Sequence, residues 1–161
     1  MKSGFIVLLR HGIAEDRTAD QRDEERRLTG EGQRRMKQIG RSLATIFPKA
    51  EAIYSSPLIR CIETSEALAK AYGELGVETT DALRPAADTS EFRRLLSNAP
   101  ARFAIFVGHE PNLTRIMLDL TQTKTDSPIA LKKGGCYGVA LEGSSGSLEW
   151  VLPPRVLRKL E

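Results

Sequence analysis

The two histidines of this sequence each follow a short apolar segment, and an arginine stands beside one of them. His11 comes directly after Arg10 at the end of the apolar run 5–9, and His109 follows the run 103–107 through a glycine. A neutral imidazole is a competent nucleophile that can accept a phosphoryl group at nitrogen. Arginine stays charged, and its planar guanidinium binds phosphate oxygens in pairs. These residue types together favour chemistry on a phosphoryl group.

Such chemistry needs fixed positive donors rather than a metal. The transition state of phosphoryl transfer spreads negative charge over the equatorial oxygens, and guanidinium groups can offset it. Two histidines without clustered cysteines or suitably spaced carboxylates make a poor zinc site. We therefore expect no metal and no cofactor.

Strands and helices alternate in the secondary structure that the sequence predicts. Short runs of β-formers indicate strands, and apolar residues at helical spacing indicate helices between them. Two alternating segments near the C-terminus, joined by the turn-forming stretch 142–146, predict an antiparallel hairpin. The expected strands are 5–9, 52–54, 77–80, 102–107, 137–141 and 148–152. The first expected helix is capped by Thr29 and ends before Pro48, and the second is capped by Ser56, has Pro57 as its first residue and ends at Gly73. A third helix begins with its own cap in the segment 89–96, and a fourth begins at Pro111.

This order predicts an α/β fold with a mostly parallel sheet covered on both faces and a C-terminal hairpin. Open α/β sheets bind ligands beyond the carboxyl ends of their strands. Arg10, His11 and His109 follow two such ends, and Arg60 lies in the first turn of the helix after another strand. We expect the four side chains to converge on one site, beside helix N-termini that favour anions.

Length and composition restrict the classes of protein to which the chain can belong. The 161 residues fit one domain, residues 1–161, and the net charge of +3 suits an anionic ligand without indicating nucleic acid. No apolar stretch is long enough for a membrane span or fits a secretory signal. Cys61 and Cys136 are too few for a disulfide framework, so we expect free thiols in the cytoplasm.

Each candidate residue also has an ordinary structural explanation. A single arginine at a strand end often only contacts water, and a buried histidine can simply bond to a loop carbonyl. The charged segment 22–27 is typical of a solvated loop, with Arg27, just before the capped helix, as the one exception to follow in the structure. The joint placement of four such residues, in a chain with two histidines, favours the functional explanation.

At these residues the chain resembles the histidine phosphatase superfamily. The sequence RHG at 10–12 resembles the family signature, and GHEPNL at 108–113 is similar to its second histidine motif. The segments RLTGEGQ at 27–33 and SSPLIRCIETSEAL at 55–68 resemble the motifs between them. The compact length is most similar to the SixA branch of phosphohistidine phosphatases. The resemblance implies a three-layer α/β/α sandwich of the phosphoglycerate mutase-like type.

The resemblance also implies roles for individual residues. His11 would be the nucleophile that is transiently phosphorylated, and Arg10, Arg60 and His109 would complete the phosphate pocket. Arg27 would be an additional phosphate contact. The backbone N–H of Glu110, at the start of its helix, could donate to a phosphoryl oxygen.

The chain departs from the family pattern at the acid that protonates a leaving alkoxide in larger members. Arg84 and Pro85 stand where that acid is expected, and Asp88 is nearby but displaced. An imidazole can leave without a strong acid, because solvent or a weak donor can protonate it. The departure therefore favours phosphohistidine over a sugar phosphate, although Glu15, Asp16 or Glu110 could still supply a proton.

The hypothesis that follows is a metal-independent phosphatase that hydrolyses phosphohistidine on a protein. Its substrate would be presented on a flexible loop or an exposed helix edge, with no nucleic acid or membrane involved. One alternative is a phosphomonoesterase for a small metabolite. Another is a non-catalytic phosphate-binding docking domain, whose expected mark is a damaged pocket, whereas all four central residues are present here.

Overall fold

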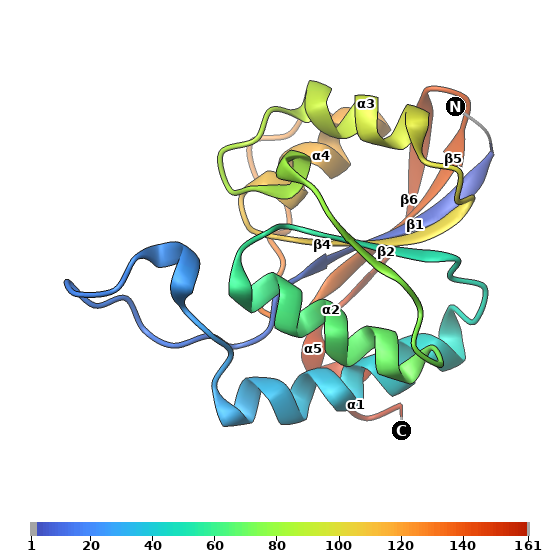
Figure 1. The fold of residues 1–161 in the computed structure, drawn as a ribbon. Coiled ribbons are helices and arrows are strands. Elements are labelled where there is room, and N and C mark those ends of the chain that lie inside the picture. The colour runs from blue at the N-terminus through green and yellow to red at the C-terminus, as the bar shows by residue number, and fades with distance from the viewer. Residues whose placement is uncertain (1–2, 161) are drawn as a thin grey trace.

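A six-stranded mixed sheet forms the middle of the molecule in the computed structural model, which describes residues 3–160 (Figure 1). The strand order is β3-β2-β4-β1-β5-β6. The first four of these strands run parallel, and β5 and β6 are antiparallel to their neighbours. The strands are β1 (Gly4–Arg10), β2 (Ala52–Ser55), β3 (Val77–Thr79), β4 (Phe103–Gly108), β5 (Cys136–Glu142) and β6 (Ser145–Leu152).

Strand β1 lies in the centre of the sheet because its apolar residues are buried on both faces. Ile6 and Leu8 belong to the core on one side of the sheet, and Val7 and Leu9 belong to the core on the other. A continuous apolar run is what a two-sided buried strand requires. The sequence prediction of a buried strand at this position is therefore confirmed.

Helices cover both faces of the sheet and give the predicted three layers (Figure 1). On one face α1 (Gly30–Ile46), α2 (Ile59–Ala71) and the short α5 (Pro154–Leu157) pack over one apolar core. On the other face α3 (Thr89–Asn98) and α4 (Asn112–Thr121) pack over the second core. None of the helices in residues 3–160 is long and apolar enough to cross a bilayer.

The C-terminal hairpin is also present, with a tight turn between β5 and β6. Gly143 has a φ of 60°, a left-handed conformation that glycine adopts without steric cost. The ring of Trp150 covers Gly138 so closely that a Cβ at this glycine would lie 2.1 Å from Trp150 Cε2. The hairpin register shifts between Gly138 and Val139, next to this contact.

Two of the predicted helix caps are wrong in detail. Helix α2 begins at Ile59 with Leu58 as its cap, so Ser56 lies two residues before the cap, where its hydroxyl accepts from the Leu58 N–H at 3.4 Å and also bonds to a histidine ring. Helix α3 is capped by Asp88, whose side chain and that of Glu91 form a capping box. Asp88 is therefore engaged at a helix start rather than available as an acid.

Candidate active site

The parallel register of β1 and β4 brings the two histidines together. Arg10 is paired with Gly108 across the two strands, so the residues that follow each strand are neighbours. The His11 N–H donates to the Gly108 carbonyl at 3.1 Å. The ring centroids of His11 and His109 are 5.2 Å apart. The convergence predicted from the strand ends is therefore present.

His11 is held as a neutral ring with one unprotonated nitrogen. Its Nδ1 lies 2.7 Å from the Gly12 carbonyl, which can only accept, so Nδ1 carries the proton and Nε2 carries the lone pair. Burial lowers the pKa of His11 to about 3, and the charges of Arg60 and Arg10 act in the same direction. A nucleophilic imidazole must be unprotonated, and these surroundings keep it so.

The guanidinium of Arg60 joins the two histidine rings. It is 3% exposed, its Nε lies 3.4 Å from His11 Nε2, and its Nη2 lies 3.3 Å from His109 Nδ1. This side chain belongs to the second residue of α2 and therefore to its first turn, as the sequence predicts, although the helix begins at Ile59 rather than Pro57. A fixed positive charge thus stands beside the unprotonated nitrogen of His11, to which Arg60 Nε donates.

His109 is neutral and is oriented by Ser56. Since Arg60 can only donate to Nδ1, the ring proton lies on Nε2, which is 2.8 Å from Ser56 Oγ. Cys61 Sγ is 3.4 Å from the same nitrogen. Burial lowers the pKa of His109 to about 3, reinforced by the neighbouring His11 and Arg60. Ser56, which the sequence predicts as a helix cap, therefore fixes the orientation of the His109 ring.

Arg10 presents an unused donor beside this cluster. Its Nη1 donates to the Leu131 carbonyl at 2.7 Å, which holds the side chain in place. Its Nε is buried and has no hydrogen-bond partner within residues 3–160. A buried donor without a partner is costly unless a ligand satisfies it. Two guanidiniums and two neutral imidazoles therefore meet in an arrangement suited to one tetrahedral anion.

Comparison with known proteins assigns the family. The model of the histidine phosphatase superfamily (branch 1) matches residues 6–87. The chain belongs to the histidine phosphatase superfamily. An uncharacterized protein from Picosynechococcus sp. is 33% identical over 139 residues, which cover 83% of each chain.

Solved structures share the same fold over nearly the whole chain. The protein histidine phosphatase SixA complexed with tungstate has a TM-score of 0.83 at 22% identity and covers 95% of this chain and 99% of its own. A SixA from Agrobacterium tumefaciens has a TM-score of 0.78 at 21% identity, covering 94% and 99%. A mycobacterial glucosyl-3-phosphoglycerate phosphatase has a TM-score of 0.74 at 14% identity, covering 94% and 100%. The compact sandwich expected from the family resemblance is therefore confirmed.

Arg27 of this histidine phosphatase superfamily member lies outside the cluster. Its side chain is 65% exposed and pairs with Glu63 at 2.8 Å. The neighbouring Arg26 is instead 14% exposed, and its Nε donates to Asp23 Oδ1 at 2.9 Å. Asp23 in turn binds Arg60, with its carbonyl 2.7 Å from Nη1 and its Oδ2 3.0 Å from Nη2. The loop arginine linked to the cluster is therefore Arg26.

The missed residue in this loop is Asp23, within the segment that the sequence predicts to be solvated. It lies in the short helix η1 (Asp23–Glu25) of the loop between β1 and α1. Burial alone would raise the pKa of Asp23, but the charge of Arg60 and hydrogen bonds from Arg26 and Arg60 outweigh it and lower this pKa. Asp23 is therefore an ionised carboxylate at neutral pH, and its i,i+3 spacing to Arg26 was the available signal.

The carboxyl group of Glu110 lies in surroundings that raise its pKa, whereas the pKa of Asp23 is lowered. Its Oε2 accepts from Thr114 Oγ1 at 2.6 Å, and its Oε1 is buried without a partner in the described part of the chain. Burial raises the pKa of Glu110, against the opposing effects of Thr114 and Arg10. The backbone N–H of Glu110, the predicted phosphate donor, donates to no other residue within 3–160.

The remaining acids considered from sequence are occupied elsewhere. Glu15 accepts from the Arg27 backbone N–H at 3.1 Å, and Asp16 is exposed on the same loop. Arg84, at the position where larger members carry an acid, pairs with Asp81 at 2.6 Å and with Glu24 at 3.0 Å. None of these side chains bonds to the two histidines.

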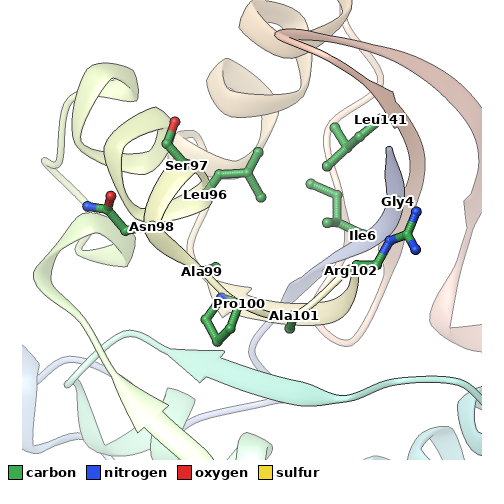
Figure 2. Close-up of a pocket in the computed structure, with 10 residues that line it drawn as sticks. All are labelled: Gly4, Ile6, Leu96, Ser97, Asn98, Ala99, Pro100, Ala101, Arg102 and Leu141. Atoms are coloured by element: carbon green, nitrogen blue, oxygen red, sulfur yellow. The ribbon is translucent and has the colours of Figure 1, made fainter. Parts of the chain in front are cut away.

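A separate hollow of about 400 Å³ lies at the opposite end of the sheet (Figure 2). It is bounded by the start of β1, the end of α3 and the segment before β4, and Ile6, Leu96 and Leu141 are among the residues around it. The one charged residue that lines it is Arg102, whose Nε donates to the Ser3 carbonyl. Among the described residues that line this hollow there is no histidine, cysteine or carboxylate, and the one hydroxyl, that of Ser97, donates to the Arg93 carbonyl, so the histidine cluster remains the candidate active site.

Proposed function

We propose that this protein is a metal-independent phosphatase that removes the phosphoryl group from phosphohistidine on a protein, through a phospho-His11 intermediate. The observation that carries this proposal is the unprotonated Nε2 of His11, which accepts from the guanidinium of Arg60 at 3.4 Å. No cofactor enters the reaction. The two buried free thiols, Cys61 and Cys136, fit a reducing cytoplasm.

The reaction has two displacement steps. In the first, the Nε2 lone pair of His11 attacks phosphorus, the P–N bond to the substrate imidazole breaks, and the leaving nitrogen keeps the bonding pair and takes a proton from solvent. In the second, water attacks the phosphorus of phospho-His11, the P–Nε2 bond breaks, and inorganic phosphate leaves with neutral His11 restored. Arg10 and Arg60 offset the charge on the transferred phosphoryl group in both steps.

The acid–base groups near the cluster support a phosphoramidate substrate over an alkyl ester. An alkoxide needs a proton as it leaves, whereas an imidazole is a far better leaving group. Asp23, the carboxylate closest to Arg60, is ionised and cannot give a proton. Glu110 has a raised pKa, but its carboxyl is bonded to Thr114.

A small-metabolite phosphomonoesterase is the second candidate. It is supported by the structural likeness to the glucosyl-3-phosphoglycerate phosphatase, a protein that acts on a small molecule. Glu110 would then be the proton donor, since burial favours its protonated form. A non-catalytic docking domain fits less well, because nothing in the four-residue cluster is damaged.

The test is a comparison of substrates in the presence of a chelator. The protein is incubated with a carrier protein phosphorylated on histidine and with a panel of phosphate monoesters, and phosphate release is measured. Release from the phosphoprotein alone supports the proposal, and release from esters alone refutes it. The matched control is His11→Asn, which should release no phosphate and yield no acid-labile, alkali-stable phosphoenzyme on rapid quenching.

A further inference from the structure

A turn that carries two lysines is attached to the backbone of Arg10 and His11. The Gly134 N–H donates to the carbonyls of Arg10 at 3.0 Å and His11 at 3.1 Å, and the Arg10 N–H donates to the Gly135 carbonyl at 3.0 Å. Together with the Leu131 carbonyl that holds the Arg10 side chain, these bonds fix residues 131–135, here called the lysine turn, beside the histidine cluster. Lys132 and Lys133 are both exposed on it.

These two lysines differ from the other cations around the loop between β1 and α1. Each arginine of that loop pairs with a carboxylate: Arg17 and Arg26 with Asp23, Arg22 with Glu25, and Arg27 with Glu63. In the described part of the chain, neither Lys132 nor Lys133 has a carboxylate within ion-pair distance. Their charge is therefore available to an external anionic group.

The lysine turn lies where α1 and α5 meet the sheet. A Cβ on Gly134 would lie 2.9 Å from Ile39 Cδ1 of α1, and one on Gly135 would lie 3.3 Å from Pro154 Cδ of α5. Ser42 Oγ of α1 donates to the Leu157 carbonyl of α5 at 2.6 Å, which joins the two helices directly. The turn and the outer surfaces of both helices therefore belong to one side of the molecule.

A second group of cations lines a shallow hollow of about 450 Å³ on α1 and the segment after α5, on the same side of the sheet. Five cations line it with one carboxylate, Glu31, which pairs with Arg35. The chain as a whole has a net charge of only +3, so the concentration of positive charge is local. The cations that line the hollow are Arg34, Arg35, Lys37, Arg41 and Arg158, and with Lys132 and Lys133 they are here called the basic face.

We propose that the basic face docks an acidic protein, so that the phosphorylated histidine of the substrate is flanked by aspartate and glutamate residues. The lysine turn holds the acidic residues next to the phosphoryl group, and the α1 side of the face holds more distant ones. Complementary charge of this kind selects partners and speeds their encounter. None of the residues that form the face is aromatic, so it lacks the stacking platforms that single-stranded nucleic acids use.

The test uses two synthetic peptides with a central phosphohistidine, one flanked by six Asp and Glu residues and the other by six Asn and Gln residues. The measured quantity is the ratio of their kcat/KM values. We expect wild type to favour the acidic peptide about fivefold to tenfold at low ionic strength, as several exposed ion pairs acting together would give. The preference should fall to less than twofold in 0.5 M salt, because the pairs are exposed to screening.

Two double variants test the face itself. Lys132→Gln with Lys133→Gln, and Arg34→Gln with Lys37→Gln, should each reduce the ratio toward one. The control pair, Lys49→Gln with Arg102→Gln, removes two exposed cations near the starts of β1 and β4, at the opposite end of the sheet, and should leave the ratio unchanged. Equal rates for the two peptides in wild type, or a ratio preserved in both double variants, would overturn the proposal.

The turnover ratio depends on the proposed function, so direct binding is measured as well. Fluorescence anisotropy of each labelled peptide with the His11→Asn variant reports docking without hydrolysis, and the acidic peptide should bind more tightly by a similar factor. If neither peptide is hydrolysed but the acidic peptide still binds more tightly, the phosphatase proposal is refuted and the docking surface is supported. Tighter binding of a single-stranded oligonucleotide, or of phosphatidylserine vesicles, than of the acidic peptide would refute the docking of a protein.

Discussion

The carboxylate of Asp23 lies on the guanidinium of Arg60, with Oδ2 3.0 Å from Nη2. Arg60 also donates to the Asp23 carbonyl and faces both histidine rings, so the donors expected to bind a phosphoryl group are occupied by the protein itself. An arriving anion must share or displace this carboxylate. Asp23 therefore competes with phosphate, while its backbone carbonyl keeps Arg60 in place.

Replacing Asp23 by asparagine should strengthen the binding of phosphate. The Asp23→Asn variant removes the negative charge next to Arg60 but keeps the backbone carbonyl that bonds to Nη1. We expect the inhibition constant of inorganic phosphate to fall about threefold to tenfold, in the range of one exposed or half-exposed charge interaction. Glu25→Gln, in the same short helix, is the control, and weaker phosphate binding by Asp23→Asn would contradict the competition.

Removal of the Arg60 side chain should damage the chemical step. Arg60→Ala deletes the donor closest to His11 Nε2, and loss of one such donor typically lowers the rate by about 10²–10³. The measurement is kcat on phosphohistidine under saturating substrate, with Arg22→Ala as an exposed control. A loss confined to KM would instead assign Arg60 to substrate binding alone.

The two adjacent loop arginines should behave differently. Arg26→Ala removes the partner of Asp23 and releases the loop from the Glu15 carbonyl, so we expect kcat/KM to fall about tenfold or more. Arg27→Ala removes an exposed pair with Glu63 and should change kcat/KM by less than about twofold. A larger loss of kcat/KM for Arg27→Ala than for Arg26→Ala would support the phosphate contact of Arg27 that the family resemblance implies.

The activity should persist in mildly acidic solution. Because the pKa of His11 is lowered to about 3, the ring stays neutral and nucleophilic as the pH falls through 6.5, where an ordinary histidine takes up its proton. We expect kcat/KM, which reports the free enzyme, to show no loss from histidine protonation between pH 7 and pH 5. Initial rates corrected for spontaneous hydrolysis of the substrate give the profile, and a tenfold decline centred near pH 6.5 would show that His11 titrates normally.

The parts of the site that sequence could predict are those attached to regular elements. Arg10, His11 and His109 follow strands whose apolar runs are unmistakable, and Arg60 follows from a helix start. Parallel neighbours end at one edge of a sheet, so the convergence of these residues needed no knowledge of the packing.

The parts that sequence could not predict depend on contacts across the fold. Asp23 meets Arg60 from a loop 37 positions away. Its i,i+3 spacing to Arg26 indicates that local pair but not the contact with Arg60. Ser56 has the residue type of a helix cap and stands before a proline, so local rules assign it to the helix. Its hydroxyl is used by His109, 53 positions further on, which only the folded arrangement reveals.

The alignment of β1 with β4 sets the spacing of the reactive groups. Arg10 is paired with Gly108 because the parallel register is continuous from the pair of Phe5 and Phe103 onward. One extra residue within 103–108 would carry His109 past His11 and reverse the faces of the strand beyond it. Insertions should therefore be tolerated least within these two central strands, because their length fixes where the two histidines stand relative to each other.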